Sequence, residues 1–150
     1  MGNATLGLAL AVLMLVGTSI PGAEAQTTPL PPNLKIVVED GVPPAVAAFA
    51  GVWVGRWSHT LDGALAVSRI YAGGKDAYKA DAVYSWGTAP SWYVLSSGYR
   101  ESEAEIKDGR LTIQTGQVTY EYTMADGVLK GVRRLGRGGQ SEATFTKVEK

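Results

Sequence analysis

The chain has 150 residues, which is enough for one domain of ordinary size, and it contains no cysteine. The lack of cysteine excludes disulfides, a lipid-modified cysteine anchor, thiolate metal sites and a cysteine nucleophile. Fourteen basic residues balance fourteen acidic ones, and this balance does not favour a nucleic acid as the partner.

The first 25 residues have the features of an export signal. Residues 6 to 20 are apolar and uncharged, and they are too short to span a bilayer comfortably. They are followed by Ala23 and Ala25, in the small-x-small spacing that signal peptidase reads. We therefore predict a signal peptide over residues 1 to 25 and a periplasmic or secreted protein. The alternative is an uncleaved membrane anchor, and only in that case do we expect the membrane as a partner.

Residues 26 to 48 contain five prolines, which predicts an extended, Pro-rich tether. Within the tether, LKIVVE at 34 to 39 is a candidate edge strand. The segment PPAVAAF, 43 to 49, begins with prolines and continues with good helix formers, so a single helical turn is expected there. All thirteen Phe, Trp and Tyr residues lie at or after Phe49, so the packed domain is predicted to span 49 to 150.

From residue 51 onward, turn signals recur and separate short runs rich in Val, Ile, Thr, Tyr and Trp. Asp-Gly and Gly-Gly pairs tolerate the positive φ angles of tight hairpin turns. Several runs alternate in polarity as half-buried strands do. The predicted turns lie at 62–63, 73–74, 108–109, 115–116, 126–127 and 136–140. The predicted strands lie near 51–60, 64–72, 75–86, 91–98, 99–107, 110–115, 117–125, 128–135 and 140–148, with 91–107 alternatively one bent strand.

About eight consecutive strands joined by tight turns predict an all-β fold, a small up-and-down antiparallel β-barrel of about eight strands. Closure favours a barrel over an open sheet because it removes the unpaired strand edges that an exported protein would expose. The interior of such a barrel is either filled by side chains or holds one small ligand. The alternation places many aromatic residues inside, so a filled core and a shallow cup at the open end both remain alternatives.

The stretch GVWVGRW, 51 to 57, places two glycines and two tryptophans on one strand face. Glycine beside tryptophan gives the indole ring room to lie flat. The pattern Phe49-x-Gly51-x-Trp53, entered from a short helical turn, resembles the first strand of lipocalin-type (calycin) barrels. The resemblance implies an eight-stranded barrel, a tryptophan that plugs the closed end, and a cup for a small ligand.

In lipocalins an arginine from late in the chain usually stacks over that tryptophan, and the resemblance therefore points to Arg133 or Arg134. The final strand, ATFTKV at 143 to 148, is similar to the last strand of avidin-type barrels. No tryptophan follows Trp92 in this chain, however, whereas avidin-type sites use tryptophans from the later strands. Biotin binding is therefore not supported.

The segment YSWGTAPSWYVLSSGY, 84 to 99, contains five aromatic residues and is expected to form a loop followed by a strand. In a strand, Trp92 and Tyr93 point to opposite faces, so one of them would lie outside. The loop is then either a contact surface for a protein or glycan or a lid that folds its aromatic residues into the barrel mouth. The candidate ligand-binding residues are Trp53, Trp57, Tyr84, Trp86, Trp92, Tyr99, Tyr120 and Tyr122.

The residue types of a hydrolase triad occur together only at Ser58, His59 and Asp62. Ser58 and His59 are neighbours on a predicted strand and so face opposite ways, which excludes the hydrogen bond that a triad needs. A zinc site would need more nitrogen or sulfur ligands than a single histidine supplies. We therefore expect no enzyme, no metal and no cofactor.

Two groups of like charge occur late in the chain. Three glutamates at 101, 103 and 105 share one strand face, which predicts a solvated outer surface rather than a catalytic or calcium site. The basic residues are expected to pair with that acidic strand or to attract an anionic ligand or membrane surface. They are Lys130, Arg133, Arg134 and Arg137.

The sequence thus predicts an exported, non-enzymatic β-barrel that binds a small apolar or aromatic molecule in a shallow cup. The alternative is an accessory or inhibitor-type interaction module that contacts a protein or glycan through the 84–99 loop. No nucleic acid is expected as a partner.

Overall fold

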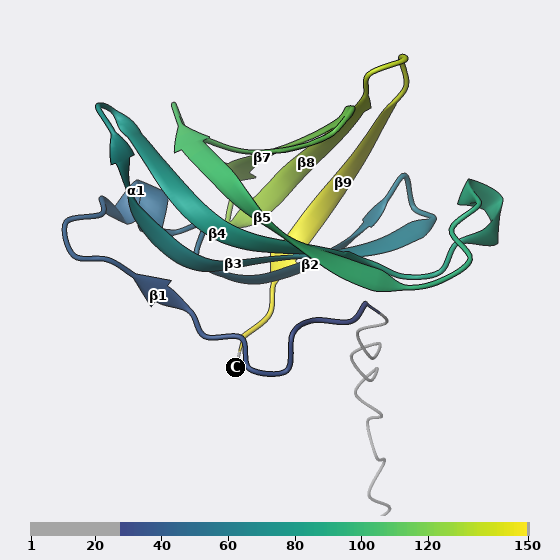
Figure 1. The fold of residues 1–150 in the computed structure, drawn as a ribbon, viewed down its shortest axis with the longest axis horizontal. Helices are drawn as coiled ribbons and strands as arrows, with labels where there is room; N and C mark the ends of the chain where they lie inside the picture. Colours follow the sequence, from purple (N-terminus) through teal and green to yellow (C-terminus); the bar gives the residue numbers. More distant parts are fainter. Residues whose placement is uncertain (1–27, 150) are drawn as a thin grey trace, which may run out of the picture.

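The computed structural model describes residues 28 to 149, which form an all-β fold (Figure 1). The predicted signal peptide, residues 1 to 25, lies outside the described residues. No helix in the described part is long and apolar enough to cross a membrane. The elements are β1 (Val37–Val38), α1 (Pro44–Ala47), β2 (Gly51–Trp57), β3 (Leu61–Gly74), β4 (Ala77–Trp86), the 3₁₀ turn η1 (Pro90–Trp92), β5 (Gly98–Lys107), β6 (Arg110–Thr115), β7 (Val118–Ala125), β8 (Val128–Leu135) and β9 (Gln140–Lys147).

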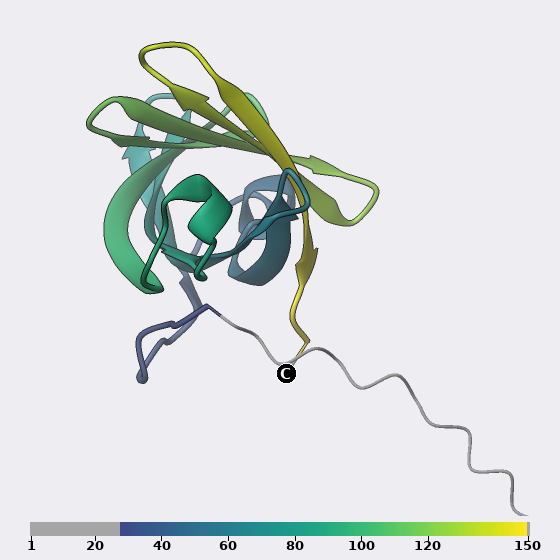
Figure 2. The same cartoon turned by 90° about the vertical axis from the view of Figure 1, so that its right-hand side faces the viewer.

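Strands β2 to β9 form a closed antiparallel barrel in which each strand pairs with its neighbours in sequence. The ring closes where residues 53 to 55 of β2 pair with residues 145 to 147 of β9. Figure 2 looks at the end of the barrel where η1 lies, and the strands form a ring around the interior. The predicted eight-stranded up-and-down barrel is therefore confirmed.

Two predicted hairpin turns form at Asp-Gly pairs. Asp108 and Gly109 have φ angles of 50° and 72°, and Asp126 and Gly127 have φ angles of 52° and 77°. Positive φ at both central residues is what a two-residue turn between twisted strands requires. The local turn chemistry alone therefore located these two hairpins.

The predicted turn at Asp62-Gly63 is wrong, because both residues lie inside β3. The chain turns earlier, at residues 58 to 60, where His59 has a φ of 60°. Gly63 instead leaves room for the indole ring of Trp57, since a Cβ there would lie 2.9 Å from Nε1 of Trp57. A ring on the neighbouring strand therefore explains the glycine, and β3 begins before its predicted start at residue 64.

The predicted strand at 91–98 is also wrong, and 91–107 is not one bent strand. Residues 90 to 92 form the turn η1, and Tyr93 follows in a left-handed conformation with a φ of 58°. Ala89 and Val94 then exchange two backbone hydrogen bonds, of 2.9 and 3.1 Å, which close the loop on itself. Pro90 favours this arrangement because it lacks a backbone N–H and fixes φ for a turn.

The described part of the tether packs on the barrel. β1 pairs in parallel with residues 69 and 70 of β3. β2 pairs with β3 only as far as residue 67, so β1 covers part of the β3 edge that β2 leaves free. The segment before β1 lies against the outer face of β3 to β5 (Figure 1). Ala66 and Val83 are buried there although they point away from the barrel interior. The predicted edge strand within 34–39 and the helical turn within 43–49 are both present.

Trp53 closes the barrel end that α1 covers. Its ring is 2% exposed and its Nε1 donates a hydrogen bond of 2.9 Å to the carbonyl of Phe49. The Nζ of Lys147 lies 5.0 Å from the centre of the indole ring, within reach of a cation–π interaction. Gly51 permits this contact, because a Cβ at that position would lie 2.6 Å from the Lys147 side chain.

The cation over Trp53 is therefore not one of the two arginines that the sequence suggested. Arg134 lies on the outer surface and forms an ion pair with Glu121. Arg133 lies near the other end of the barrel, where its guanidinium is 5.8 Å from the ring of Trp92. A late basic residue covers Trp53, but it comes from the last strand and is a lysine.

The middle of the barrel is filled by aromatic side chains. The ring centre of Trp57 lies 5.3 Å from that of Phe145 and 6.2 Å from that of Tyr122. Aromatic pairs at such distances and in tilted or edge-on arrangements pack favourably beyond the area that they bury. Gly131 makes room for the cluster, since a Cβ there would lie 3.0 Å from both Trp57 and Phe145. The two sequence alternatives are thus both realised, with a filled centre and space left at one end.

Replacing Gly55 by alanine tests the packing at the closure. A Cβ at Gly55 would lie 2.5 Å from the backbone oxygen of Thr144 and 2.9 Å from the ring of Phe145. We expect Gly55→Ala to lower the free energy of unfolding by about 1–3 kcal/mol, although alanine is normally better than glycine within a strand. Urea denaturation measures this change.

The matched control is Thr146→Ala, in the same closing ladder but on the outer face. We expect it to cost less than about 1 kcal/mol, the span of intrinsic strand preferences. A Gly55→Ala protein as stable as the wild type would show that β2 and β9 do not approach as closely as described.

Candidate functional site

A cavity of about 250 Å³ lies at the η1 end of the barrel, opposite Trp53. Strands on both sides of the ring contribute to its wall, and the loop between β4 and β5 supplies one apolar residue. The lining residues are Trp57, Leu61, Ala64, Tyr84, Ser85, Trp86, Val94, Arg100, Tyr120, Tyr122 and Arg133.

The floor of the cavity is the aromatic cluster at the barrel centre. Trp57 is 4% exposed and Tyr122 is 1% exposed, so the cavity ends where these rings begin. Burial raises the pKa of Tyr122 well above its usual range. The floor is therefore uncharged at physiological pH.

The walls are also aromatic. The ring centres of Tyr84 and Tyr120 lie 5.0 Å apart, with 33° between their planes, and Trp86 lies 5.9 Å from Tyr84. Trp86 lies close over Gly98 on the next strand, where a Cβ would come within 2.8 Å of the indole. Three rings thus form one continuous surface that can stack against a flat apolar group.

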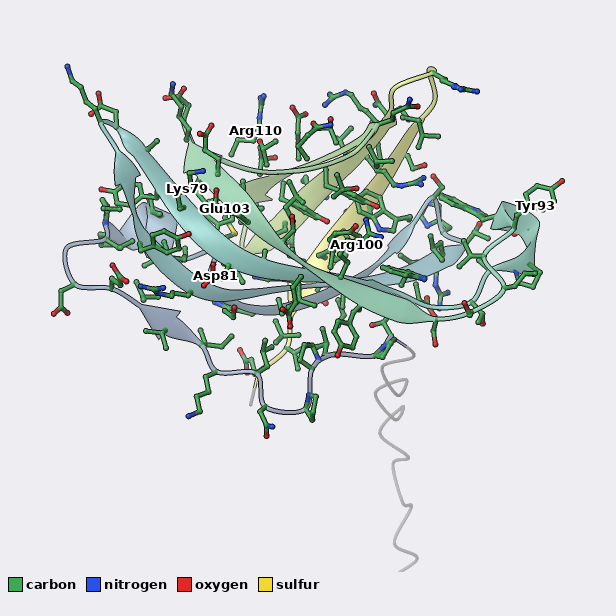
Figure 3. All side chains as sticks on the ribbon, in the orientation of Figure 1. Lys79, Asp81, Tyr93, Arg100, Glu103 and Arg110 are labelled. Atoms are coloured by element: carbon green, nitrogen blue, oxygen red, sulfur yellow. The ribbon has the colours of Figure 1, made fainter. Side chains whose placement is uncertain are left out.

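Two arginines complete the lining. Neither is among the eight candidate ligand-binding residues, although Arg133 belongs to the basic cluster for which an anionic ligand was one of the expected partners. Arg100 pairs with Tyr84 across the β4–β5 ladder, and Arg133 pairs with Tyr120 across the β7–β8 ladder. Paired residues of antiparallel strands lie on the same face, so both arginines face the barrel interior. Figure 3 shows Arg100 between β5 and the strands on the opposite side of the ring. For Arg100, the alternation along β5 could have indicated this orientation, because residues 100 and 104 lie on the same face of the strand and Ala104 is buried.

Tyr120 links these arginines to the aromatic wall. Burial raises the pKa of Tyr120, and a hydrogen bond with Arg133 together with the charges of Arg133 and Arg100 opposes this shift without reversing it. The phenol therefore stays protonated near neutral pH. Because it carries no charge, it does not neutralise either guanidinium.

The loop of residues 87 to 97, the lid, lies across this end of the barrel (Figure 2). The backbone N–H of Gly87 donates to the carbonyl of Asp62 at 2.9 Å, and Nε1 of Trp86 donates to the carbonyl of Ser96 at 3.1 Å. Trp92 and Val94 pack against the core, while Tyr93 is 91% exposed and Leu95 is 83% exposed. Tyr93 stands at the far tip of the loop in Figure 3.

The structure brings together five of the eight candidate ligand-binding residues around the cavity, with a sixth close by. Trp92 belongs to the lid and contacts Arg133. Trp53 lies at the closed end of the barrel, and Tyr99 is 43% exposed on the outer face of β5. The five lining residues are Trp57, Tyr84, Trp86, Tyr120 and Tyr122.

A second hollow, of about 530 Å³, lies outside the barrel between the tether and strands β3 to β5. Its lining includes Lys35, Asp81 and Glu101, and the described residues around it contain no aromatic ring. It is larger than the interior cavity, but charged side chains and a peripheral segment border it. The interior cavity is the better candidate because apolar walls with a few converging polar groups are typical of ligand sites.

The residues considered for chemistry do not assemble into a catalytic or metal centre. Ser58 and His59 lie in the exposed β2–β3 turn, not on a strand as predicted, and Asp62 forms an ion pair of 2.5 Å with Arg56. Within residues 28 to 149, no three His, Cys, Asp or Glu side chains gather as a metal ion would require.

The charged groups lie mainly on the outer surface. Glu103 is exposed there and contacts Lys79 and the hydroxyl of Tyr71, as expected for a solvated strand face. The basic cluster is divided between the two faces. Lys130 and Arg134 point outward, while Arg133 points inward.

No protein-family model matches the chain, and no curated protein matches its sequence.

Trp57 and Tyr93 should differ sharply in their effect on stability. Trp57 packs among three aromatic rings at the barrel centre, so we expect Trp57→Ala to cost about 3–5 kcal/mol. Tyr93 is exposed, so we expect Tyr93→Ala to change stability by less than about 0.5 kcal/mol. Equal losses in denaturant unfolding would contradict this assignment of core and surface.

Buried tyrosines make stability dependent on alkaline pH. The folded protein raises the pKa of Tyr122 above its ordinary value of 10.0, so only the unfolded chain releases this proton just above pH 10. Stability should then fall as pH rises, by up to about 1.4 kcal/mol per pH unit for such a group. In Tyr122→Phe we expect a shallower fall between pH 10 and 11, measured by urea unfolding. The exposed control Tyr93→Phe should follow the wild type, and identical slopes for all three proteins would contradict the buried phenol.

Proposed function

We propose that the protein is an exported, non-enzymatic β-barrel that binds a small apolar or aromatic molecule in the cavity at the η1 end. The observation that carries this proposal is the aromatic surface of Tyr84, Trp86 and Tyr120, which faces an interior space above the packed rings. The apolar segment at 6–20 and the Ala-x-Ala spacing after it support export.

The size of the cavity favours a small ligand. Its volume is about 250 Å³. Cavities of roughly 150 Å³ bind benzene, and pockets for drug-sized ligands run from roughly 300 to 1,000 Å³. A molecule of one or two rings matches the space between these limits.

A second function is supported by the outer side of the lid. Tyr93 and Leu95 are largely exposed side chains that lie two residues apart in the loop. Tyrosine is enriched in contact surfaces with proteins and glycans. The alternative is therefore an interaction module that uses these two residues, with the barrel as a rigid support.

The indole N–H signals in a nitrogen–proton NMR spectrum distinguish the two functions. On titration with 2-naphthamide, a neutral two-ring probe, we expect the signals of Trp57 and Trp86 to shift because both rings line the cavity. The signal of Trp53 should not shift, because its N–H donates a hydrogen bond to the carbonyl of Phe49 at the barrel end away from the cavity.

The double variant Tyr93→Ala/Leu95→Ala serves as the matched control for the lid. Binding in the cavity predicts the same probe affinity as in the wild type, because neither side chain is among the lining residues. Loss of probe binding in this variant would move the site to the outer loop. A complete absence of indole shifts with aromatic probes, neutral or anionic, at millimolar concentration would contradict the proposed function.

A further inference from the structure

We infer that the ligand of this cavity is a small aromatic acid whose anionic group contacts Arg133 and Arg100. The inference rests on the proposed function and adds to it the charge of the ligand and the residues that recognise that charge.

The two arginines flank the most closely spaced aromatic pair of the cavity. Arg100 lies beside Tyr84 in one ladder, and Arg133 lies beside Tyr120 in another. The rings of Tyr84 and Tyr120 are 5.0 Å apart, so this pair joins the two ladders across the interior. A planar molecule stacked on these rings would have a guanidinium on each side of it.

None of the described residues that line the cavity is Asp or Glu, so none of them supplies a negative charge to balance these arginines. Four other arginines of the described chain, by contrast, form ion pairs with carboxylates on the outer surface. These are Arg56 with Asp62, Arg69 with Glu39, and Arg110 and Arg134 with Glu121.

The partners of Arg133 among the described residues are neutral side chains. Its guanidinium lies near the Trp92 ring and hydrogen-bonds to the phenol of Tyr120. Arg133 is half-buried, and partial burial weakens the hydration of a charge. An anion would restore the lost stabilisation, because a carboxylate accepts two parallel hydrogen bonds from one guanidinium.

The aromatic walls and the limited volume determine the rest of the ligand. Three rings line the space beside the arginines, and guanidinium groups themselves stack on aromatic faces. A cavity of about 250 Å³ is below the roughly 300–1,000 Å³ of sites for larger ligands, so a long lipid chain exceeds the space. An aryl carboxylate of one or two rings combines the required charge, shape and size.

Comparison of 2-naphthoate with 2-naphthamide tests the inference, since the two probes have nearly the same shape and differ in charge. In calorimetric titrations at pH 7, we expect the wild-type protein to bind 2-naphthoate at least about tenfold more tightly than 2-naphthamide. This ratio corresponds to the usual strength of hydrogen bonds to a charged group.

Variants of the two arginines test whether these residues cause the preference for the carboxylate probe. We expect R133Q and R100Q each to weaken 2-naphthoate binding by roughly tenfold, while 2-naphthamide binding changes by less than about twofold. R133K keeps the charge but loses the planar pair of donors, so its loss should be smaller than that of R133Q. R137Q is the matched control because Arg137 lies in the exposed β8–β9 turn, away from the cavity. The indole NMR spectrum of each variant checks that the barrel remains folded.

The outcomes separate the inference from the proposed function. Equal affinity for the two probes in the wild type, or a carboxylate preference that survives in both R133Q and R100Q, overturns the inference while leaving the cavity as a binding site. If neither probe binds and no indole signal moves, the proposed function fails together with the inference.

Discussion

The close approach of β2 and β9 at Gly55 is the constraint on which the barrel depends. The ring is closed by three residue pairs between these strands, and at one of them the backbone of Thr144 comes within 2.5 Å of the position that a Cβ of Gly55 would occupy. The ring of Phe145 lies against the same bare backbone and then packs on Trp57. The closure of the ring and the packing of the barrel centre therefore both depend on the absence of a side chain at Gly55. A side chain at this glycine would disturb the strand pairing and the aromatic cluster together.

The aromatic cluster divides the interior into two ends with different properties. At one end Trp53 is covered by α1 and by the Lys147 side chain, and its N–H is already satisfied by the backbone. At the other end the rings of Tyr84 and Tyr120 border open space next to two cationic side chains. The fixed end supplies stability through burial. The open end holds two guanidinium groups, and none of the described residues that line the cavity is a carboxylate. A few charged groups that converge on an apolar pocket are typical of ligand sites.

The barrel was predictable because its signals are local and repeated, whereas the exceptions depend on contacts between strands. The Asp-Gly turns at 108–109 and 126–127 follow from backbone preference alone. The same dipeptide at 62–63 lies inside a strand, where Gly63 accommodates the indole of Trp57. Turn preferences of the local sequence cannot predict a contact with a residue on the neighbouring strand. Alternation correctly put Trp53 and Trp57 on one face, but Trp53 closes one end of the barrel, whereas Trp57 packs at the barrel centre and forms the floor of the cavity. Arg100 was not singled out from the sequence because a charged residue is normally assigned to the outer face. Arg133 was considered only as a member of the basic cluster and as a possible cation over Trp53.

A crystal structure of the protein grown with 2-naphthoate tests the central claim most directly. The account predicts electron density for the two-ring probe in the cavity, stacked along Tyr84 and Tyr120, with its carboxylate within hydrogen-bond distance of Arg133 or Arg100. Density for the probe only on the outer surface, or a barrel end filled by the side chains of the 87–97 loop with no room for the probe, would contradict it.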